Sequence, residues 1–377
     1  MSDQRLEQAK EKINGGKGEE APALLEQIIK EDRHNIAAWQ AYADSWPPDH
    51  RRSQENRWEM RNRFVCSILF ILFMLYTAGC ASTTVTPAVE ATVPADQKDI
   101  QILFDDFDYS SIEEMSANGW ILRSGMGWPG VTGASFRPEN VSFVEYPAQP
   151  GNRLLRMTSS TDGSREGTFQ TQICHQRKYL SGTYAARVRF SDEPVSGVDG
   201  DQIVQTFYMI TPYDRPLNPE YSEMDFEYLP NGGWGGAPTT LHVTTWETVQ
   251  IEPWNADNIS QSVQGSQAGW HTLVLQVMGG TVRYFVDGTL IAQHGGAYYP
   301  DAPVSINFNL WFIEGGLVQS EGIREYQEDV DWVFHQVDTL LMPDEVEANV
   351  AELRNASVSF EDTVSPGDLP LPSLCDL

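Results

Sequence analysis

The sequence predicts an all-β protein: a sandwich of two sheets, with a short helical extension before it and a short helix after it. Apolar residues recur at the period of two that is typical of half-buried strands. The turn pairs Gly279-Gly280 and Asp287-Gly288 separate three such runs, which predicts two successive hairpins. The 377 residues include 30 Gly and 22 Pro, which suits a fold with many turns.

Residues 1–59 are predicted to be a helical extension. The part from Gly18 to Trp39 resembles a tetratricopeptide repeat, although Arg33 stands where a proline is usual. Little more than one repeat is present, whereas about three stacked repeats are needed to bury a core. Two interpretations stay open: a docking element, or upstream sequence joined to the gene in error.

Residues 60–80 are typical of an export signal. Arg61 and Arg63 precede an apolar run of about 13 residues, which is short for a membrane span and suits a signal peptide. The ending Ala78-Gly79-Cys80 resembles a bacterial lipoprotein signal, which implies lipidation at Cys80. A signal anchor is the alternative. In either case we expect an extracytoplasmic bacterial protein, membrane-anchored or secreted.

Two segments follow the export signal. Residues 81–99, rich in Thr, Ala, Val and Pro, are predicted to be a solvated tether. Residues 100–342 are predicted to be the β-sandwich. Beyond the two hairpins, its strands are expected at the other apolar runs, which are residues 154–157, 183–190, 202–210, 241–246, 304–311 and 330–337.

Residues 343–377 are expected to form a short helix and a loose tail. Pro343 stands at the first turn of the helix. Its apolar stripe consists of Val346, Val350 and Leu353. Cys375 of the tail can pair with Cys174 in an exported protein, and two free thiols are the alternative.

The composition favours a neutral partner. The net charge is −28, from 53 acidic and 25 basic side chains. Such a chain repels nucleic acid and anionic polymers, so we expect no nucleic-acid partner. The sequence holds no C-x-x-C pair and no cluster of histidines, and we predict no cofactor. The oligomeric state is left open.

The stretch from Tyr221 to Leu229 alternates strictly between polar and apolar residues. Three residues are expected to face the core: Met224, Phe226 and Tyr228. Three carboxylates are expected in a row on the opposite face: Glu223, Asp225 and Glu227. No Lys or Arg occurs between Arg215 and Arg283. Because the carboxylates repel one another without a nearby cation, at least one should have a raised pKa.

Such a row can cleave a glycosidic bond, because that reaction needs one protonated and one ionised carboxyl group. On a strand the Cα atoms of Glu223 and Glu227 lie about 13 Å apart, whereas a retaining pair needs carboxyls about 5–5.5 Å apart. The interpretation therefore predicts the concave face of a bent sheet. A solvated acidic strand face is the alternative.

Aromatic residues accompany this strand in the sequence. Indoles stack on the flat C–H faces of sugars, so these residues are candidate sugar contacts: Trp234, Trp246, Trp254 and Trp311. The alternating run from Leu241 to Trp246 is the expected next strand, which would bring His242 beside the carboxylates. Core tryptophans and a structural histidine are the alternatives.

These residues resemble glycoside hydrolase family sixteen, whose members are concanavalin A-like jelly rolls that act on β-glucans and galactans. The segment Glu223-Met-Asp225-Phe-Glu227 looks like the E-x-D-x-E motif of the family. Five other segments stand in the family's order, one before this motif and four after it. They are residues 179–189, 270–272, 284–288, 309–311 and 330–333. The resemblance covers roughly residues 100–340.

By this resemblance Glu223 would be the nucleophile, Asp225 its hydrogen-bonding assistant and Glu227 the acid/base. The one-residue gap between Asp225 and Glu227 predicts a strand without a bulge. That resembles the lichenase and xyloglucan-transglycosylase branch rather than the laminarinases. A structural calcium away from the active site stays open.

The sequence thus predicts an exported, endo-acting glycoside hydrolase that cleaves a neutral, β-glucan-like polysaccharide with retention. The alternatives are a non-catalytic glycan-binding module, a transglycosylase and a polysaccharide lyase. All three carboxylates are kept, which favours an enzyme over a module. A lyase needs cations against its uronate substrate, and the stretch between Arg215 and Arg283 offers none.

Overall fold

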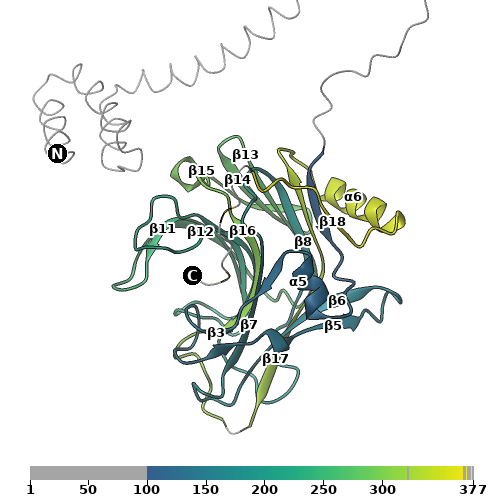
Figure 1. Ribbon diagram of the computed structural model, residues 1–377. Coiled ribbons are helices and arrows are strands. Elements are labelled where there is room, and N and C mark those ends of the chain that lie inside the picture. The colour runs from purple at the N-terminus through teal and green to yellow at the C-terminus, as the bar shows by residue number, and fades with distance from the viewer. Residues whose placement is uncertain (1–99, 321, 368–370, 372–374, 376–377) are drawn as a thin grey trace, which may run out of the picture. The chain divides into compact units, whose positions relative to one another are not determined.

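The computed structural model describes residues 100–320, 322–367, 371 and 375. The predictions for residues 1–59, 60–80 and 81–99, including lipidation of Cys80, lie outside these residues. Figure 1 shows the described part as two layers of strands with a helix on one side. In that part, no helix is both long and apolar enough to cross a membrane.

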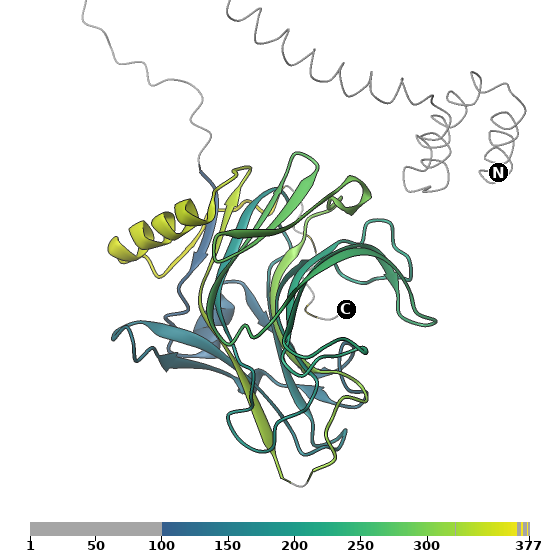
Figure 2. The same ribbon diagram turned by 180° about the vertical axis from the view of Figure 1, so that it is seen from behind.

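One sheet is strongly curved, and Figures 1 and 2 both show it bending toward β11 (Thr240–Gln250) and β12 (Asn255–Gln264). All neighbouring strands in it are antiparallel. Their spatial order is β2 (Trp120–Leu122), β7 (Phe169–His175), β16 (Ser305–Phe312), β9 (Ile203–Ile210), β10 (Glu223–Leu229), β11 (Thr240–Gln250) and β12 (Asn255–Gln264).

The second sheet covers the convex side of the first. Its order is β15 (Thr289–Gly295), β14 (Thr281–Val286), β13 (Gly269–Met278), β8 (Gly182–Phe190) and β17 (Arg324–Val337). The other edge of β17 pairs with β6 (Arg153–Thr161) and with β1 (Ile102–Asp105). In turn, β6 pairs with β5 (Val141–Glu145), and β1 pairs with β18 (Phe360–Asp362).

The remaining elements are short, apart from one helix. They are α5 (Ile112–Ala117), β3 (Gly125–Met126), β4 (Ser135–Phe136), the 3₁₀ turns at Pro138–Asn140 and Gly296–Tyr298, and α6 (Pro343–Asn355). α6 confirms the predicted C-terminal helix. Val346 and Val350 of its apolar stripe pack on Phe104 and Trp332 of the second sheet.

The core between the sheets follows from the period of two. One row of fully buried side chains crosses five strands of the curved sheet: Ile173, Phe308, Phe207, Phe226 and Val243. Successive side chains of a strand point to opposite faces, so the next residue of each strand lies on the concave face. The core therefore fixes which residues face outward.

The expected strands and both hairpins are confirmed, but α5 and several strands were not expected. These strands are β1, β2, β3, β4, β5, β7, β12 and β18. β12 reads Asn-Ala-Asp-Asn-Ile-Ser-Gln-Ser-Val-Gln and is largely exposed. It is the last strand of the curved sheet, where pairing with β11 needs no apolar face. A polar strand of this kind leaves no hydrophobic pattern in the sequence.

The segment that follows α6 is held to the sandwich at several positions that the structure describes. β18 pairs with β1, and Lys178 Nζ donates to the carbonyl oxygen of Val364 at 3.0 Å. Cys375 forms a disulfide with Cys174, with Cα atoms 5.5 Å apart. Of the two alternatives for these cysteines, the structure has the disulfide.

Loss of this disulfide is expected to destabilise the fold. The bond joins residues 201 positions apart, so it restricts the unfolded chain strongly. We expect Cys375→Ser to lower the free energy of unfolding by about 2–5 kcal/mol. Thermal unfolding with and without dithiothreitol checks this, since reductant should lower the Tm of the wild type and leave that of the variant unchanged. An equal response in both proteins would contradict the prediction.

Candidate active site

The three carboxylates lie in a row on the concave face of β10. Their neighbours Met224, Phe226 and Tyr228 are fully buried in the core, as predicted. β10 pairs with β9 and β11 without a register shift, so the expected absence of a bulge is confirmed. Regular alternation therefore directs all three carboxylates to the concave side.

A cavity of about 700 Å³ lies over this row. It is lined by every site residue predicted within the described chain, namely Glu223, Asp225, Glu227, Trp234, His242, Trp246, Trp254 and Trp311. Residues from β10, β11 and β16 and from two loops thus meet in one hollow. Their roles in binding or catalysis stay predictions.

The strand β11 pairs with β10, as expected, and its register brings His242 beside the carboxylates. His242 pairs with Glu227, Thr244 with Asp225, and Trp246 with Glu223. Directly opposite residues of antiparallel strands have Cβ atoms about 4.5–5.5 Å apart. In addition, the indole Nε1 of Trp246 donates to Asp225 Oδ2 at 2.8 Å.

The tryptophans form two pairs, one at each end of the row. Trp246 and Trp254 have ring centroids 6.1 Å apart and lie at the Glu223 end. Trp234 and Trp311 have centroids 6.0 Å apart and lie at the other end, where Trp311 packs on Leu229. Trp234 and Trp254 are 61% and 59% exposed, whereas Trp311 is 8% exposed and mainly a packing residue.

Burial dominates the electrostatics of the row. It raises the pKa of Glu223 to about 7, and a hydrogen bond from Tyr221 works in the opposite direction. Burial, together with repulsion from Glu223, raises the pKa of Glu227 to about 8. The pKa of Asp225 lies well above its ordinary value through burial and through repulsion from Glu227 and Glu223. The predicted pKa increase is confirmed, and burial contributes more to it than repulsion.

Positive charge does not offset this effect in the cavity. Among the described residues that line it, none is Lys or Arg. Burial lowers the pKa of His242, so its imidazole is neutral near pH 7. The cavity therefore combines a surplus of carboxyl groups with a neutral ring.

Sequence reasoning missed several lining residues, including Tyr208, Tyr221, Trp128, Asn309 and Glu314. Asn309 and Tyr208 lie on β16 and β9, so the alternation of those strands could have identified them. Trp128 and Glu314 come from loops, whose conformation no periodicity predicts.

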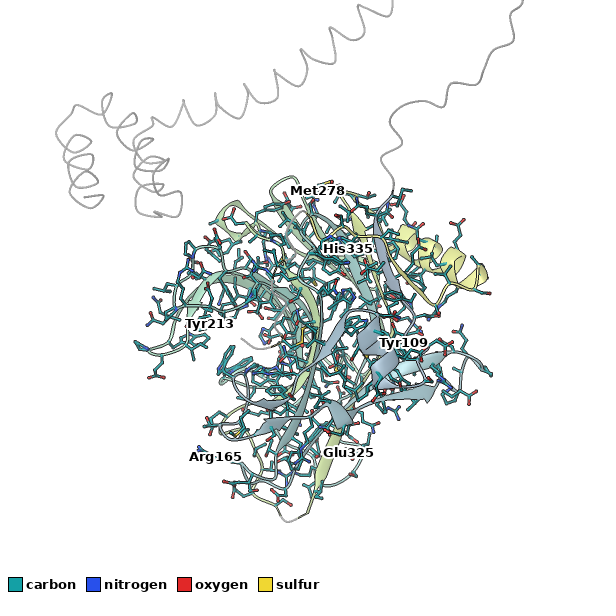
Figure 3. The ribbon with its side chains drawn as sticks, in the orientation of Figure 1. Tyr109, Arg165, Tyr213, Met278, Glu325 and His335 are labelled. Carbon is teal, nitrogen blue, oxygen red and sulfur yellow. A yellow bond between two sulfur atoms is a disulfide. The ribbon has the colours of Figure 1, made fainter. Side chains whose placement is uncertain are left out.

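Glu314 ties two loops together at the edge of the cavity. Its Oε2 accepts a hydrogen bond from the backbone N–H of Thr132 at 2.6 Å. Its Oε1 lies 3.0 Å from Arg165 Nη2, and Figure 3 labels Arg165. These contacts hold the loop that carries Trp128 near the loop that follows β16.

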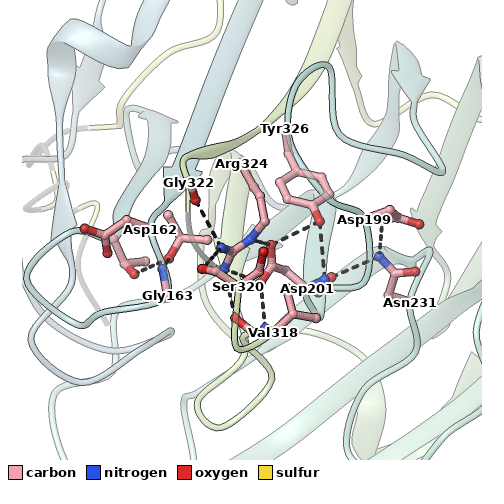
Figure 4. Close-up of polar contacts among 12 residues, drawn as sticks. Asp162, Gly163, Asp199, Asp201, Asn231, Val318, Ser320, Gly322, Arg324 and Tyr326 are labelled. Atoms are coloured by element: carbon pink, nitrogen blue, oxygen red, sulfur yellow. Dashed lines mark hydrogen bonds and ion pairs between the residues drawn. The ribbon is translucent and has the colours of Figure 1, made fainter.

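The loop after Glu314 is anchored by a buried ion pair, which Figure 4 shows. Arg324 Nε lies 2.6 Å from Asp201 Oδ2, and their side chains are 1% and 0% exposed. The same guanidinium donates to the carbonyl oxygens of Val318 and Gly322. Because two backbone carbonyls of the loop bind one buried cation, the ion pair anchors the part of the loop next to β17.

Several solved structures are similar to this chain. A β-glucanase of Bacillus licheniformis shares 17% identity, covering 62% of this chain and 97% of that one, with a TM-score of 0.45. A family-sixteen endo-glucanase from Bacteroides ovatus shares 14%, covering 61% and 98%, with a TM-score of 0.48. A laminarinase from Flavobacterium sp. UMI-01 shares 15%, covering 62% and 97%, with a TM-score of 0.45.

No protein-family model matches the chain, and no curated protein matches its sequence. The strand pairings of the described residues form a two-layer β-sandwich, which is the fold class that the sequence predicts.

Proposed function

We propose that this protein cleaves internal β-glycosidic bonds of a neutral, β-glucan-like polysaccharide with retention of configuration. The observation that carries the proposal is that Glu223 and Glu227 line one cavity, each with a raised pKa. Near neutral pH one carboxyl can hold a proton while the other is ionised, which glycoside hydrolysis requires. Exposed indoles at both ends of the row suit a chain of sugar rings.

In the proposed reaction Glu223 attacks the anomeric carbon, and Glu227 protonates the leaving oxygen. A covalent glycosyl-enzyme forms, and the glycosidic bond breaks. The ester removes the charge of Glu223 and with it the repulsion that raises the pKa of Glu227. The pKa of Glu227 therefore falls, so its carboxyl is ionised for the second step, in which it takes a proton from the attacking water.

Asp225 supports the row from between the two glutamates. Its Oδ2 accepts from Trp246, and its Oδ1 is buried with no hydrogen-bond partner among the described residues. Burial and repulsion from Glu227 and Glu223 raise the pKa of this carboxyl well above its ordinary value, which favours its protonated form. A protonated Asp225 can donate to a neighbouring carboxylate, which fits the assisting role implied by the family motif.

The substrate is proposed to be neutral because the lining carboxyls repel uronates and the described lining has no cation to offset them. We further propose an extracytoplasmic location, with lipidation at Cys80 or a signal anchor. This second proposal is supported by the sequence of residues 60–80 alone.

Product analysis tests the function. The protein is incubated with mixed-linkage glucan, xyloglucan and laminarin, and released reducing ends are measured together with the first-formed anomer by NMR. We expect oligosaccharides with a β-anomeric end. Binding without release would indicate a glycan-binding module, and products that absorb in the ultraviolet would indicate a lyase. An α-anomer formed first would contradict retention.

The exposed indoles give a separate prediction. Trp234→Ala and Trp254→Ala should each raise KM about tenfold, equivalent to about 1.4 kcal/mol, because each removes one stacking surface for a sugar ring. The Tm should stay unchanged, since both side chains are mostly exposed. Leu290→Ala removes an apolar side chain of similar exposure from β15 and should leave KM unchanged. An unchanged KM in both tryptophan variants would contradict sugar stacking.

A further inference from the structure

A phenol is fixed against one of the two glutamates. Tyr221 lies two residues before Glu223, and its hydroxyl donates a hydrogen bond to Glu223 Oε2. The side chain is 2% exposed and clusters with Ile210 and Val249, while its ring packs edge-on against Tyr213 at 6.4 Å. Burial raises the pKa of Tyr221 well above its ordinary value, so the hydroxyl keeps its proton and can act as a donor.

The other glutamate has no such donor. Within the described residues, no group donates a hydrogen bond to the carboxyl of Glu227. The residue opposite it on β9 is Thr206, whose hydroxyl donates to the carbonyl oxygen of Asn309 at 3.0 Å. The residue opposite it on β11 is His242, which is neutral near pH 7. Among the described residues, Glu227 therefore receives no hydrogen bond like the one that Tyr221 gives to Glu223.

The other titratable groups that face the row do not distinguish the two glutamates. Asp225 lies between them and is bound to the indole of Trp246. Tyr208 on β9 stands opposite Asp225, and its hydroxyl accepts from Gln172 Nε2 at 2.8 Å. Burial raises the pKa values of both groups, which favours their neutral forms.

We propose that Tyr221 is a positioning residue that decides which glutamate is ionised: its hydrogen bond stabilises the carboxylate of Glu223 and leaves the proton on Glu227. The two glutamates are the same residue type, on the same face of one strand, in one cavity. A charge-assisted hydrogen bond favours the ionised form of its acceptor, so a donor at one end makes the pair asymmetric. This inference rests on the proposed function.

The pH profile of Tyr221→Phe tests this inference. The variant keeps the ring and loses the donor, so the Glu223 carboxylate becomes less stable and its pKa rises. We expect the ascending limb of the kcat/KM profile on β-glucan to move up by about one pH unit, the size of a lost hydrogen bond to a charged group. Purely structural damage would lower the whole profile without moving this limb.

Tyr213→Phe is the matched control. Tyr213, labelled in Figure 3, belongs to the same aromatic cluster, and its hydroxyl makes no hydrogen bond to Glu223. Its loss should leave the ascending limb in place. The proposal is overturned if folded Tyr221→Phe keeps the wild-type limb, or if Tyr213→Phe moves the limb as far.

A second measurement needs neither turnover nor the Tyr221 variant. The wild type is labelled with ¹³C at the glutamate carboxyls and titrated by NMR, and Glu223→Gln and Glu227→Gln assign the two signals. The Glu223 signal should titrate at lower pH than the Glu227 signal. The reverse order overturns the proposal. Failure of the wild type to release reducing ends would instead overturn the proposed function, and the titration order would still be measured.

Discussion

Replacing Glu223 with Gln is expected to reduce kcat/KM on β-glucan by on the order of 10⁴-fold, comparable with the loss of a nucleophile in other enzymes. The amide has nearly the same shape as the carboxyl, and Tyr221 can still donate to its oxygen. It cannot form the glycosyl ester, however, so the first step loses its nucleophile. Rates of reducing-end release by the variant and the wild type check the prediction.

The same substitution should stabilise the fold at alkaline pH. The pKa of Glu223 is about 7 in the folded protein, above its ordinary value, so the folded state holds this proton more tightly than the unfolded state. The wild type therefore loses stability as pH rises from about 4.5 through 7. Glu223→Gln has no such proton, and its Tm at pH 8 should exceed that of the wild type. A lower Tm at pH 8 would contradict the assignment of a raised pKa to the buried Glu223 carboxyl.

Azide rescue assigns the two glutamates separately. In Glu223→Ala, azide can enter the vacated space and displace the leaving group once, giving an α-glycosyl azide from a β-linked substrate. In Glu227→Ala, Glu223 still forms the ester, and azide attacks that ester to give the β-glycosyl azide. The same anomer from both variants would contradict the assigned roles.

The parts of the site that could be predicted from sequence are those that alternation determines. One apolar residue in two fixes the buried face of β10 and β11, and a slip of one residue would expose that face. That constraint places His242, Thr244 and Trp246 on the same face as the carboxylates, whereas the exact pairs, such as Trp246 with Glu223, come from the structure. The bend of the sheet was inferred less directly, from the distance between Glu223 and Glu227 on a flat strand.

The parts that could not be predicted depend on contacts between distant segments. The position of Trp128 depends on Glu314, which holds the backbone of Thr132, about 180 residues away in the chain. The disulfide depends on how closely the tail approaches β7. The hydrogen bond from Tyr221 was missed for another reason. Tyrosine counts as an apolar core residue in a hydrophobic pattern, so the pattern gives no sign that its hydroxyl donates to Glu223.

Replacing Glu227 with Gln is expected to separate the two steps of the reaction. Glycan cleavage should slow by about 10²–10⁴-fold, the usual contribution of a general acid. A dinitrophenyl β-glycoside has a leaving group that needs no proton, so its first step should stay close to the wild-type rate. Hydrolysis of the glycosyl-enzyme should then be slow, because no carboxylate at position 227 activates water. A burst of dinitrophenol, with one sugar unit added to the mass of the protein, checks this outcome.

The pH profile of this variant completes the test. Glu227 has a pKa of about 8 and loses its proton as the pH rises. The kcat/KM of the wild type should therefore fall on the alkaline side, which gives the pH profile a descending limb. The limb should be absent in Glu227→Gln, because the amide does not titrate. Glu145→Gln, on the second sheet, should keep the wild-type profile. If Glu227→Gln kept the descending limb, the proton donor would be another group, and the repulsion from Glu223 would have no part in catalysis.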